Sequence, residues 1–134
     1  DNEILSFKSG IPGFPVEKEF VLLPHTEDSP FAFLQSVSNA DLSFLVVDPF
    51  YSQPDYTFEL DDAELEKMGI NAENPPQIMA IVSLRDPLAE STMNLIAPLV
   101  VNRQTGEGRQ IVLERTAYTT RHKLFVDSPK QGGE

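Results

Sequence analysis

Two carboxylates, Asp48 and Asp55, stand at the ends of the stretch DPFYSQPD. Two carboxylates flanking a cleft are the arrangement that glycoside hydrolases use as acid and base or nucleophile. The same stretch contains Phe50 and Tyr51, and aromatic side chains on loops are typical anchors of protein interfaces. The prolines that bound the loop leave two outcomes for these rings, display to a partner or folding back over the core. The stretch therefore predicts a protein-binding loop, with a hydrolase acid pair as an alternative.

The two histidines offer little metal or nucleophilic chemistry. His25 and His122 lie far apart in the chain, and neither has a His or Cys partner at the spacing of a metal site. His122 belongs to a basic stretch with Arg115, Arg121 and Lys123. This stretch could hold an anion, or its charges could protect a solvated edge strand from wrong pairing.

The motifs of common enzyme classes are absent from the sequence. The GEG at residues 106–108 lacks the third glycine and the following helix of a dinucleotide site. There is no G-x-S-x-G nucleophile elbow. The chain has no cysteine, which excludes a disulfide scaffold, a thiolate zinc site and a cysteine nucleophile. We therefore expect no enzyme activity, no metal and no cofactor.

The charge of the chain is distributed unevenly. The net charge is −11, and residues 1–66 contain fourteen of the 21 acidic residues but only two of the ten Lys and Arg. An acidic chain repels phosphate backbones, which argues against direct nucleic-acid binding. The acidic half either serves solubility alone or steers a basic protein partner. We predict that Asp48, Asp55 and Glu59 contact such a partner and that Phe50 and Tyr51 add apolar contact.

Short strands must position these residues. Proline and glycine interrupt the chain at short intervals, and the runs between them are rich in Phe, Val, Ile and Leu, which is typical of a sandwich or barrel. Runs such as FLVV and IMAIV indicate strands buried on both faces. Two glycines in RQTGEGR predict a hairpin turn within residues 100–112. We expect strands at residues 4–7, 20–23, 31–37, 42–47, 56–59, 78–84, 94–101, 110–113 and 123–125.

One short helix is predicted near residues 61–69. Asp61 or Asp62 can cap its start, Gly69 can end it, and Leu65 and Met68 share a face that must dock on the sheet. The two adjacent aspartates are better explained as caps than as metal ligands, because carboxylates satisfy free N–H groups at a helix start. The fold class is therefore mainly β, a compact antiparallel barrel-like domain with one short helix.

The length of 134 residues predicts a single domain, here residues 1–126, followed by a flexible polar tail at 127–134. No apolar run approaches the ~20 residues of a membrane span, and the start DNEILSF predicts no secretory signal. The stretch GIPGFP at residues 10–15 predicts a fixed corner between the first two strands, since prolines preset the backbone and glycines allow positive φ. Within it, Ile11 and Phe14 either plug one end of the barrel, which we favour, or form an apolar contact.

Five stretches, taken in order, resemble one known family, the flagellar assembly factor FliW. They are FKSGIPGFP, PFAFLQSVSNADLSFLVVDP, NPPQIMAIVSL, NLIAPLVVNRQTGEGRQIVL and YTTRHKL. Each is mostly strand and turn residues and is weak alone, but their common order and spacing over residues 4–125 are specific. The resemblance implies a compact, mostly antiparallel β-barrel-like fold, in agreement with the pattern of prolines and glycines.

The resemblance also implies a function. FliW-like proteins are non-enzymatic and cytoplasmic, bind newly made flagellin, and bind the RNA-binding translational regulator CsrA. Binding of CsrA relieves its repression of the flagellin message, and flagellin and CsrA exclude one another. The family pattern favours antagonism from outside the RNA site, through allostery or electrostatics, over direct blocking. A helical segment of flagellin would suit an apolar groove. We expect a monomer when the protein is free.

A second reading is a small β-barrel that binds a small ligand or single-stranded nucleic acid. Such a site needs a basic groove with aromatic platforms. Only residues 115–123 are basic enough, and Tyr118 is the sole aromatic side chain there.

Overall fold

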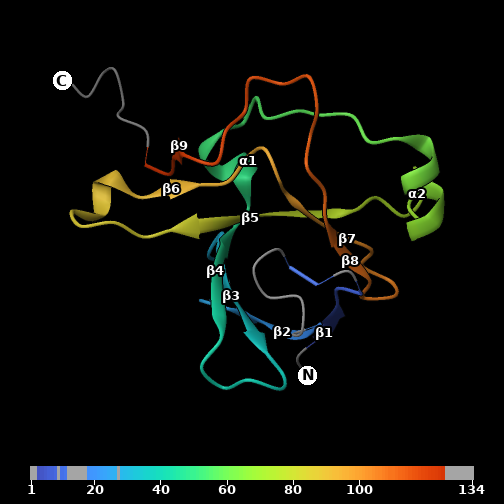
Figure 1. The fold of residues 1–134 in the computed structure, drawn as a ribbon, viewed down its shortest axis with the longest axis horizontal. Coiled ribbons are helices and arrows are strands. Elements are labelled where there is room, and N and C mark those ends of the chain that lie inside the picture. The colour runs from blue at the N-terminus through green and yellow to red at the C-terminus, as the bar shows by residue number, and fades with distance from the viewer. Residues whose placement is uncertain (1–2, 9, 12–17, 27, 126–134) are drawn as a thin grey trace.

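The computed structural model describes residues 3–8, 10–11, 18–26 and 28–125 (Figure 1). Its fold is mainly antiparallel β with few helices, which confirms the predicted class. No helix in these described ranges is long and apolar enough to cross a membrane. The predicted tail at 127–134 lies outside the described residues. The elements are β1 (Glu3–Ser6), β2 (Glu19–Pro24), β3 (Phe31–Ser36), β4 (Ser43–Val47), α1 (Pro49–Ser52), α2 (Asp62–Met68), β5 (Gln77–Ser83), η1 (Leu88–Glu90), β6 (Thr92–Met93), β7 (Leu99–Val101), β8 (Gly108–Gln110) and β9 (His122–Lys123).

The sheet is organised around β5. Strands β1 to β4 pair in chain order, and β4 pairs with one edge of β5. The other edge of β5 pairs with β7 and, further along, with β6. Strand β8 pairs with β7, and β9 pairs with β6. The sheet therefore has a four-stranded meander on one side of β5 and two short hairpin-like extensions on the other.

The sheet does not close into a barrel. The turn before β8 reaches β1 through a hydrogen bond from the Ser6 N–H to the Gly106 carbonyl, at 2.8 Å, and a single parallel bridge to Glu107. This approach requires glycine. Gly106 has φ +81°, and a Cβ there would lie 2.7 Å from the Ile4 carbonyl oxygen. A Cβ on Gly108 would lie 2.6 Å from the buried ring of Phe7.

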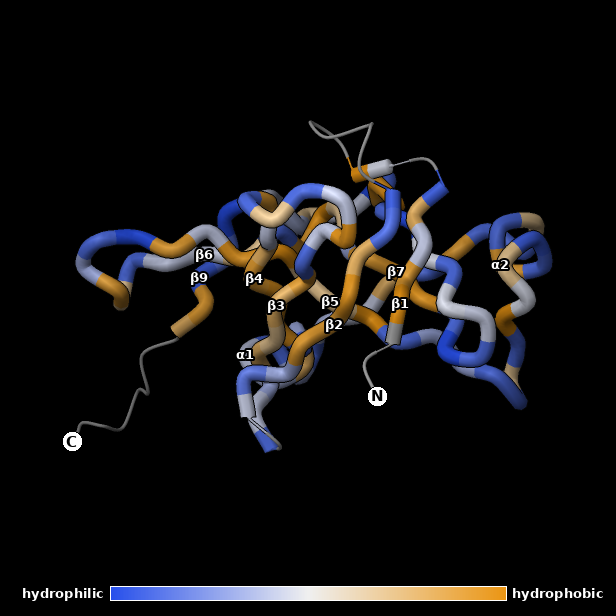
Figure 2. The backbone as a smooth tube through the Cα atoms, turned by 90° about the horizontal axis from the view of Figure 1, so that it is seen from below, coloured by the Kyte–Doolittle hydropathy of each residue, from blue (hydrophilic) through white to orange (hydrophobic). Residues whose placement is uncertain are grey.

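The core lies on both faces of the central strands. Val46 and Val47, neighbours on β4, belong to different buried clusters, and so do Met79 and Ala80 on β5. This confirms that FLVV and IMAIV are strands buried on both sides. A third cluster packs Met68 of α2 against Ile70 and Val100. Figure 2 shows the apolar residues gathered along the strands, with polar residues in the outer loops.

The predicted helix is α2. The Asp61 carboxylate accepts a hydrogen bond from the Ala63 N–H at 3.2 Å, and Gly69 ends the helix in the left-handed conformation with φ +71°. Met68, the last residue of the helix, is buried. The expectation of a single helix is wrong, because α1 and the 3-10 turn η1 also form. For α1 the signal is present in the sequence, since Asp48 caps it and Pro49 suits the first helical position.

Four predicted strands differ from the structure. The strand predicted at 110–113 forms earlier, as β8 at residues 108–110, and the one predicted at 123–125 forms as β9 at residues 122–123. Residues 56–59 are extended but pair with no strand in the described part of the chain. The strand predicted at 94–101 is interrupted between β6 and β7. There the Asn94 side chain accepts from the Ala97 N–H, and the amides of Leu95 and Ile96 bond to Thr119 instead of β5. Pro98, which has no N–H, follows directly.

The corner at GIPGFP is described only in part. Gly10 has φ +74°, as the glycine there predicts. Ile11 is 2% exposed and packs in the same cluster as Leu5 and Phe7, so it belongs to the core. Phe14 lies outside the described residues, and its role stays a prediction.

Candidate protein-binding surface

Helix α1 presents the predicted loop residues. The Asp48 carboxylate accepts a hydrogen bond from the Phe50 N–H at 3.0 Å, and the buried Pro49 fixes the helix to the end of β4. The turn leaves Tyr51 64% and Phe50 41% exposed. Phe50 leans on Tyr56, with ring centroids 5.7 Å apart, whereas Tyr51 does not cap the core. The loop therefore displays at least one aromatic ring, and contact with a partner stays a prediction.

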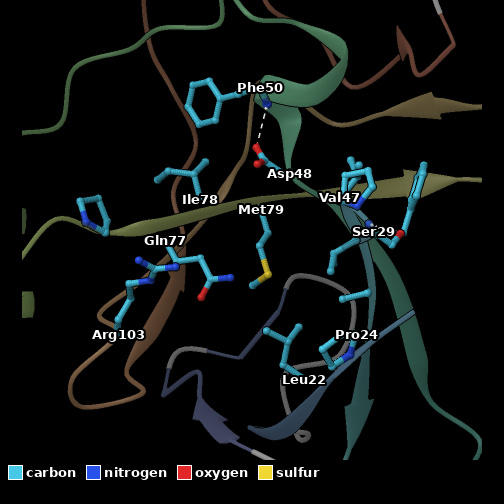
Figure 3. Close-up of a pocket in the computed structure, with 15 residues that line it drawn as sticks. Leu22, Pro24, Ser29, Val47, Asp48, Phe50, Gln77, Ile78, Met79 and Arg103 are labelled. Carbon is cyan, nitrogen blue, oxygen red and sulfur yellow. Dashed lines mark hydrogen bonds between the residues drawn. The ribbon is translucent and has the colours of Figure 1, made fainter. Parts of the chain in front are cut away.

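A cavity of about 450 Å³ lies beside Asp48 and Phe50 (Figure 3). Its walls come from β2 to β5, with Met79 in the middle of the view. Arg103, from the turn between β7 and β8, lies on another side of the cavity from Asp48. One carboxylate and one guanidinium thus border a hollow whose other lining residues are mostly apolar.

Phe50 also lines a second hollow, of about 320 Å³. The two hollows share Phe50, Pro76 and Ile78 as lining residues, so they flank the same ring. The rest of the second hollow is mostly apolar and includes Phe58, Leu60 and Leu65. An apolar segment of a partner could contact both hollows across Phe50.

A third hollow, of about 700 Å³, lies between residues 57–61 and residues 111–116. We call it the slot. Its floor is lined by Phe58 and Leu60, which it shares with the second hollow. Its rim is acidic, with Glu59 from the predicted set and one ion pair nearby, in which Glu64 accepts from Arg109 at 2.7 Å. The charged residues that line the slot are Glu59, Asp61, Glu64, Glu114 and Arg115.

The five predicted site residues are therefore not one cluster. Asp48 and Phe50 share a cavity, Glu59 lines the slot, and Asp55 and Tyr51 are exposed and line none of the hollows described above. Asp55 does not border the cavity that Asp48 borders, and Asp48 is engaged as a helix cap. The structure gives the hydrolase alternative no shared cleft.

An aromatic cluster fixes the segment that follows α1. The Tyr56 hydroxyl donates to the Leu95 carbonyl at 2.7 Å, and the Tyr118 hydroxyl accepts from the Thr57 N–H at 3.0 Å. Burial, with a smaller contribution from Tyr118, raises the pKa of Tyr56 above its ordinary value of 10.0. The two rings are 4.8 Å apart, and His122 stacks edge-on against Tyr118. Tyr118 is half-buried, and its ring packs against Tyr56 and His122, so it is no free-standing platform for a base.

The sequence did not single out Phe58, Leu60 or Val112. Alternation of Tyr56, Phe58 and Leu60 with polar residues was the available signal, because it marks one apolar side of an extended segment. Val112 is 64% exposed, and only the fold brings it to the slot. Within the described ranges, no group of three His, Cys, Asp or Glu is placed to hold a metal ion.

Comparison with known proteins decides the family. The model of the FliW protein family matches residues 1–124. The chain belongs to the FliW family. A flagellar assembly factor FliW of Desulfitobacterium hafniense (strain DSM 10664 / DCB-2) is 52% identical over 130 residues, covering 97% of this chain and 86% of the relative. The FliW of Bacillus subtilis (strain 168) is 44% identical over 128 residues, covering 96% of this chain and 90% of the relative.

A solved structure extends this likeness to the fold. The crystal structure of a flagellar assembly factor FliW matches with a TM-score of 0.81 and 41% sequence identity. The match covers 92% of this chain and 86% of the other. The resemblance seen in the five sequence stretches is thereby confirmed, and the open, mainly antiparallel sheet is that of the FliW family.

Proposed function

We propose that this chain is a flagellar assembly factor that acts by binding two proteins, flagellin and the regulator CsrA, without catalysing a reaction. The observation that supports it most is the family membership, since relatives that match over most of their length are named flagellar assembly factors. The surface fits a binding role. It has exposed aromatic residues at α1 and two hollows beside them whose lining residues are mostly apolar.

CsrA is the partner proposed for the acidic surface. A protein that holds RNA must carry positive charge, and the net charge of −11 here is complementary to it. A bound acidic protein repels phosphate over about a Debye length, which is roughly 8–10 Å at physiological salt. Antagonism can therefore act from a surface beside the RNA site, and it weakens as salt rises.

Flagellin is the partner proposed for the apolar hollows around Phe50. An amphipathic helix of unassembled flagellin would place its apolar side chains on either side of this ring. The second hollow and the slot share Thr57, Phe58 and Leu60. Two partners that use these neighbouring hollows compete for the same residues, which accounts for mutual exclusion. The exchange takes place in the cytoplasm, with this chain as a monomer when free.

The experiment is calorimetric titration of this protein with purified CsrA, at low and at moderate salt, repeated after saturation with flagellin. Binding that weakens with salt and disappears with flagellin is the expected result. Binding that ignores salt would contradict the electrostatic part of the proposal. No binding to either protein at micromolar concentration would overturn it.

A further inference from the structure

One strand edge next to the slot has unpaired peptide groups. Strand β8 pairs with β7, and the pairing continues beyond it through hydrogen bonds from the Ile111 N–H to the Pro98 carbonyl, 3.0 Å, and from the Leu113 N–H to the Ile96 carbonyl, 2.7 Å. In an antiparallel ladder, alternate residues direct their N–H and C=O groups to opposite edges. Val112 and Glu114 therefore direct theirs away from β7, and neither forms a backbone hydrogen bond to any residue that the structure describes.

The segment on the opposite side of the slot, residues 57–60, also has peptide groups without a hydrogen bond among the described residues. Residues 57–60 have the alternating exposure of a strand, with Phe58 and Leu60 partly buried and Thr57 and Glu59 exposed. The Thr57 N–H bonds to Tyr118, but the peptide groups of Phe58, Glu59 and Leu60 have no hydrogen bond within the described residues. In Figure 1 the chain that follows β8 rises toward this segment, which links α1 to α2. Residues 57–60 and residues 111–114 both line the slot.

Side chains around the slot define what would fit. Val112, a β-branched residue, is 64% exposed at the open edge, without a charge of its own to discourage pairing. Phe58, Leu60 and Leu113 provide apolar contact. Four acidic residues and one arginine line the slot, so the rim favours a segment with positive charge.

We propose that the slot binds an extended, basic segment of a protein partner, which adds as a β-strand to residues 110–114. Strand addition supplies affinity through main-chain hydrogen bonds and specificity through alternate side chains. Here the added strand would bond to Val112 and Glu114, with apolar side chains toward Phe58 and Leu60 and basic ones toward Glu59 and Glu114. This inference rests on the proposed function, in which the basic partner is CsrA.

The test is amide hydrogen exchange of this protein, resolved by residue, alone and in complex with purified CsrA. In the free protein the Ile111 and Leu113 amides exchange slowly because they bond to the Pro98 and Ile96 carbonyls, whereas the Val112 and Glu114 amides exchange fast. Strand addition slows the exchange of the Val112 and Glu114 amides by at least about tenfold and leaves the exchange of the Ile111 and Leu113 amides nearly unchanged. The Ile111 and Leu113 amides are thus a control within the same segment.

The outcomes separate the inference from the function beneath it. If calorimetry shows a complex while the Val112 and Glu114 amides exchange at their free rate, strand addition is overturned and the proposed function stands. If neither CsrA nor flagellin binds, the proposed function and this inference both fail.

A matched set of surface variants provides a second test. Val112→Lys places a positive charge at the open edge and should weaken CsrA binding at least about tenfold by repulsion and edge blocking. Val112→Thr keeps the β-branch and should bind nearly as the native protein does. Leu84→Lys makes the same chemical change at another exposed position, 58% exposed and away from the slot, and should bind normally. Equal binding of Val112→Lys and Leu84→Lys would contradict the proposal.

Discussion

Two regions of this molecule differ in whether their polar groups have hydrogen-bond partners. At the corner between α2 and the turn after β7, the buried side chain of Asn102 bonds to the Met68 carbonyl, the Asn74 side chain and the amides of Gln104 and Thr105. Across the slot, the peptide groups of Val112 and Glu114 have no such partners among the described residues. The hydrogen bonds of Asn102 stabilise the fold, whereas the peptide groups at the slot are available to a partner. We call the Asn102 region the Asn102 corner.

The largest expected effect on stability comes from removing the hydrogen bonds of the Asn102 side chain. Asn102 is 2% exposed, so Asn102→Ala leaves the Met68 carbonyl and two turn amides without their partner. We expect the free energy of unfolding to fall by roughly 3 kcal/mol, because each unsatisfied buried group costs about 1–3 kcal/mol. Urea unfolding measures this loss.

The matched control for Asn102 is Asn39→Ala. Asn39 is exposed, and among the residues that the structure describes its side chain bonds only to the Asp41 amide. A loss below about 1 kcal/mol is expected there. Similar losses for the two asparagines would show that the corner contributes no more than an ordinary surface turn.

The next largest effect is expected where the start of β8 approaches Phe7, the residue after β1. Gly108→Ala places a methyl group 2.6 Å from the ring of Phe7, which is fully buried and has no room to withdraw. Overpacking of this kind costs typically about 1–3 kcal/mol, and we expect about 2 kcal/mol in urea unfolding. Phe7→Leu in the same chain should recover part of the loss by making room. Additive losses in the double variant would contradict the steric account.

The helix cap of α2 has a smaller effect. Asp61→Ala removes the acceptor of the Ala63 N–H, and caps of this kind contribute about 1 kcal/mol. Asp61→Asn keeps an acceptor and should retain most of the stability, since Asn is an equally good cap. The free energies of unfolding of the two variants test this. If both substitutions cost the same, the charge of Asp61 matters and its role as a hydrogen-bond acceptor does not.

The sequence predicted the parts of this structure that depend on local signals. Asp61 and Gly69 bounded α2 correctly, and continuous apolar runs identified the central strands. Residues 56–59 lie between prolines and glycines as strands do, but they pair with no strand in the described part of the chain, because a short apolar run says nothing of whether a neighbouring strand is present. The predicted strand at 94–101 was interrupted by a turn that Asn94 closes with its side chain.

The candidate surface was predictable only in part, for the same reason. Phe50 and Tyr51 were predicted in a loop between prolines, and the structure exposes them. The slot depends on residues about fifty positions apart in the chain, 57–61 and 111–116, which only the tertiary fold brings together. The uneven charge of the sequence predicted Glu59 for the binding surface but could not show that Val112 lines the same slot.

The smallest expected effect on stability, and the sharpest contrast with the corner, is at Tyr51. Its side chain is 64% exposed and forms no hydrogen bond within the described part of the chain, so Tyr51→Ala should change the free energy of unfolding by less than about 0.5 kcal/mol. If the ring anchors flagellin, its removal should weaken flagellin binding by tenfold or more, as for interface hot spots of about 2 kcal/mol. Calorimetry with flagellin measures the affinity, with Leu88→Ala, 57% exposed on η1, as the control. A variant that is both stable and fully competent to bind would exclude Tyr51 from the binding surface and leave Phe50 as the aromatic anchor of the two that α1 presents.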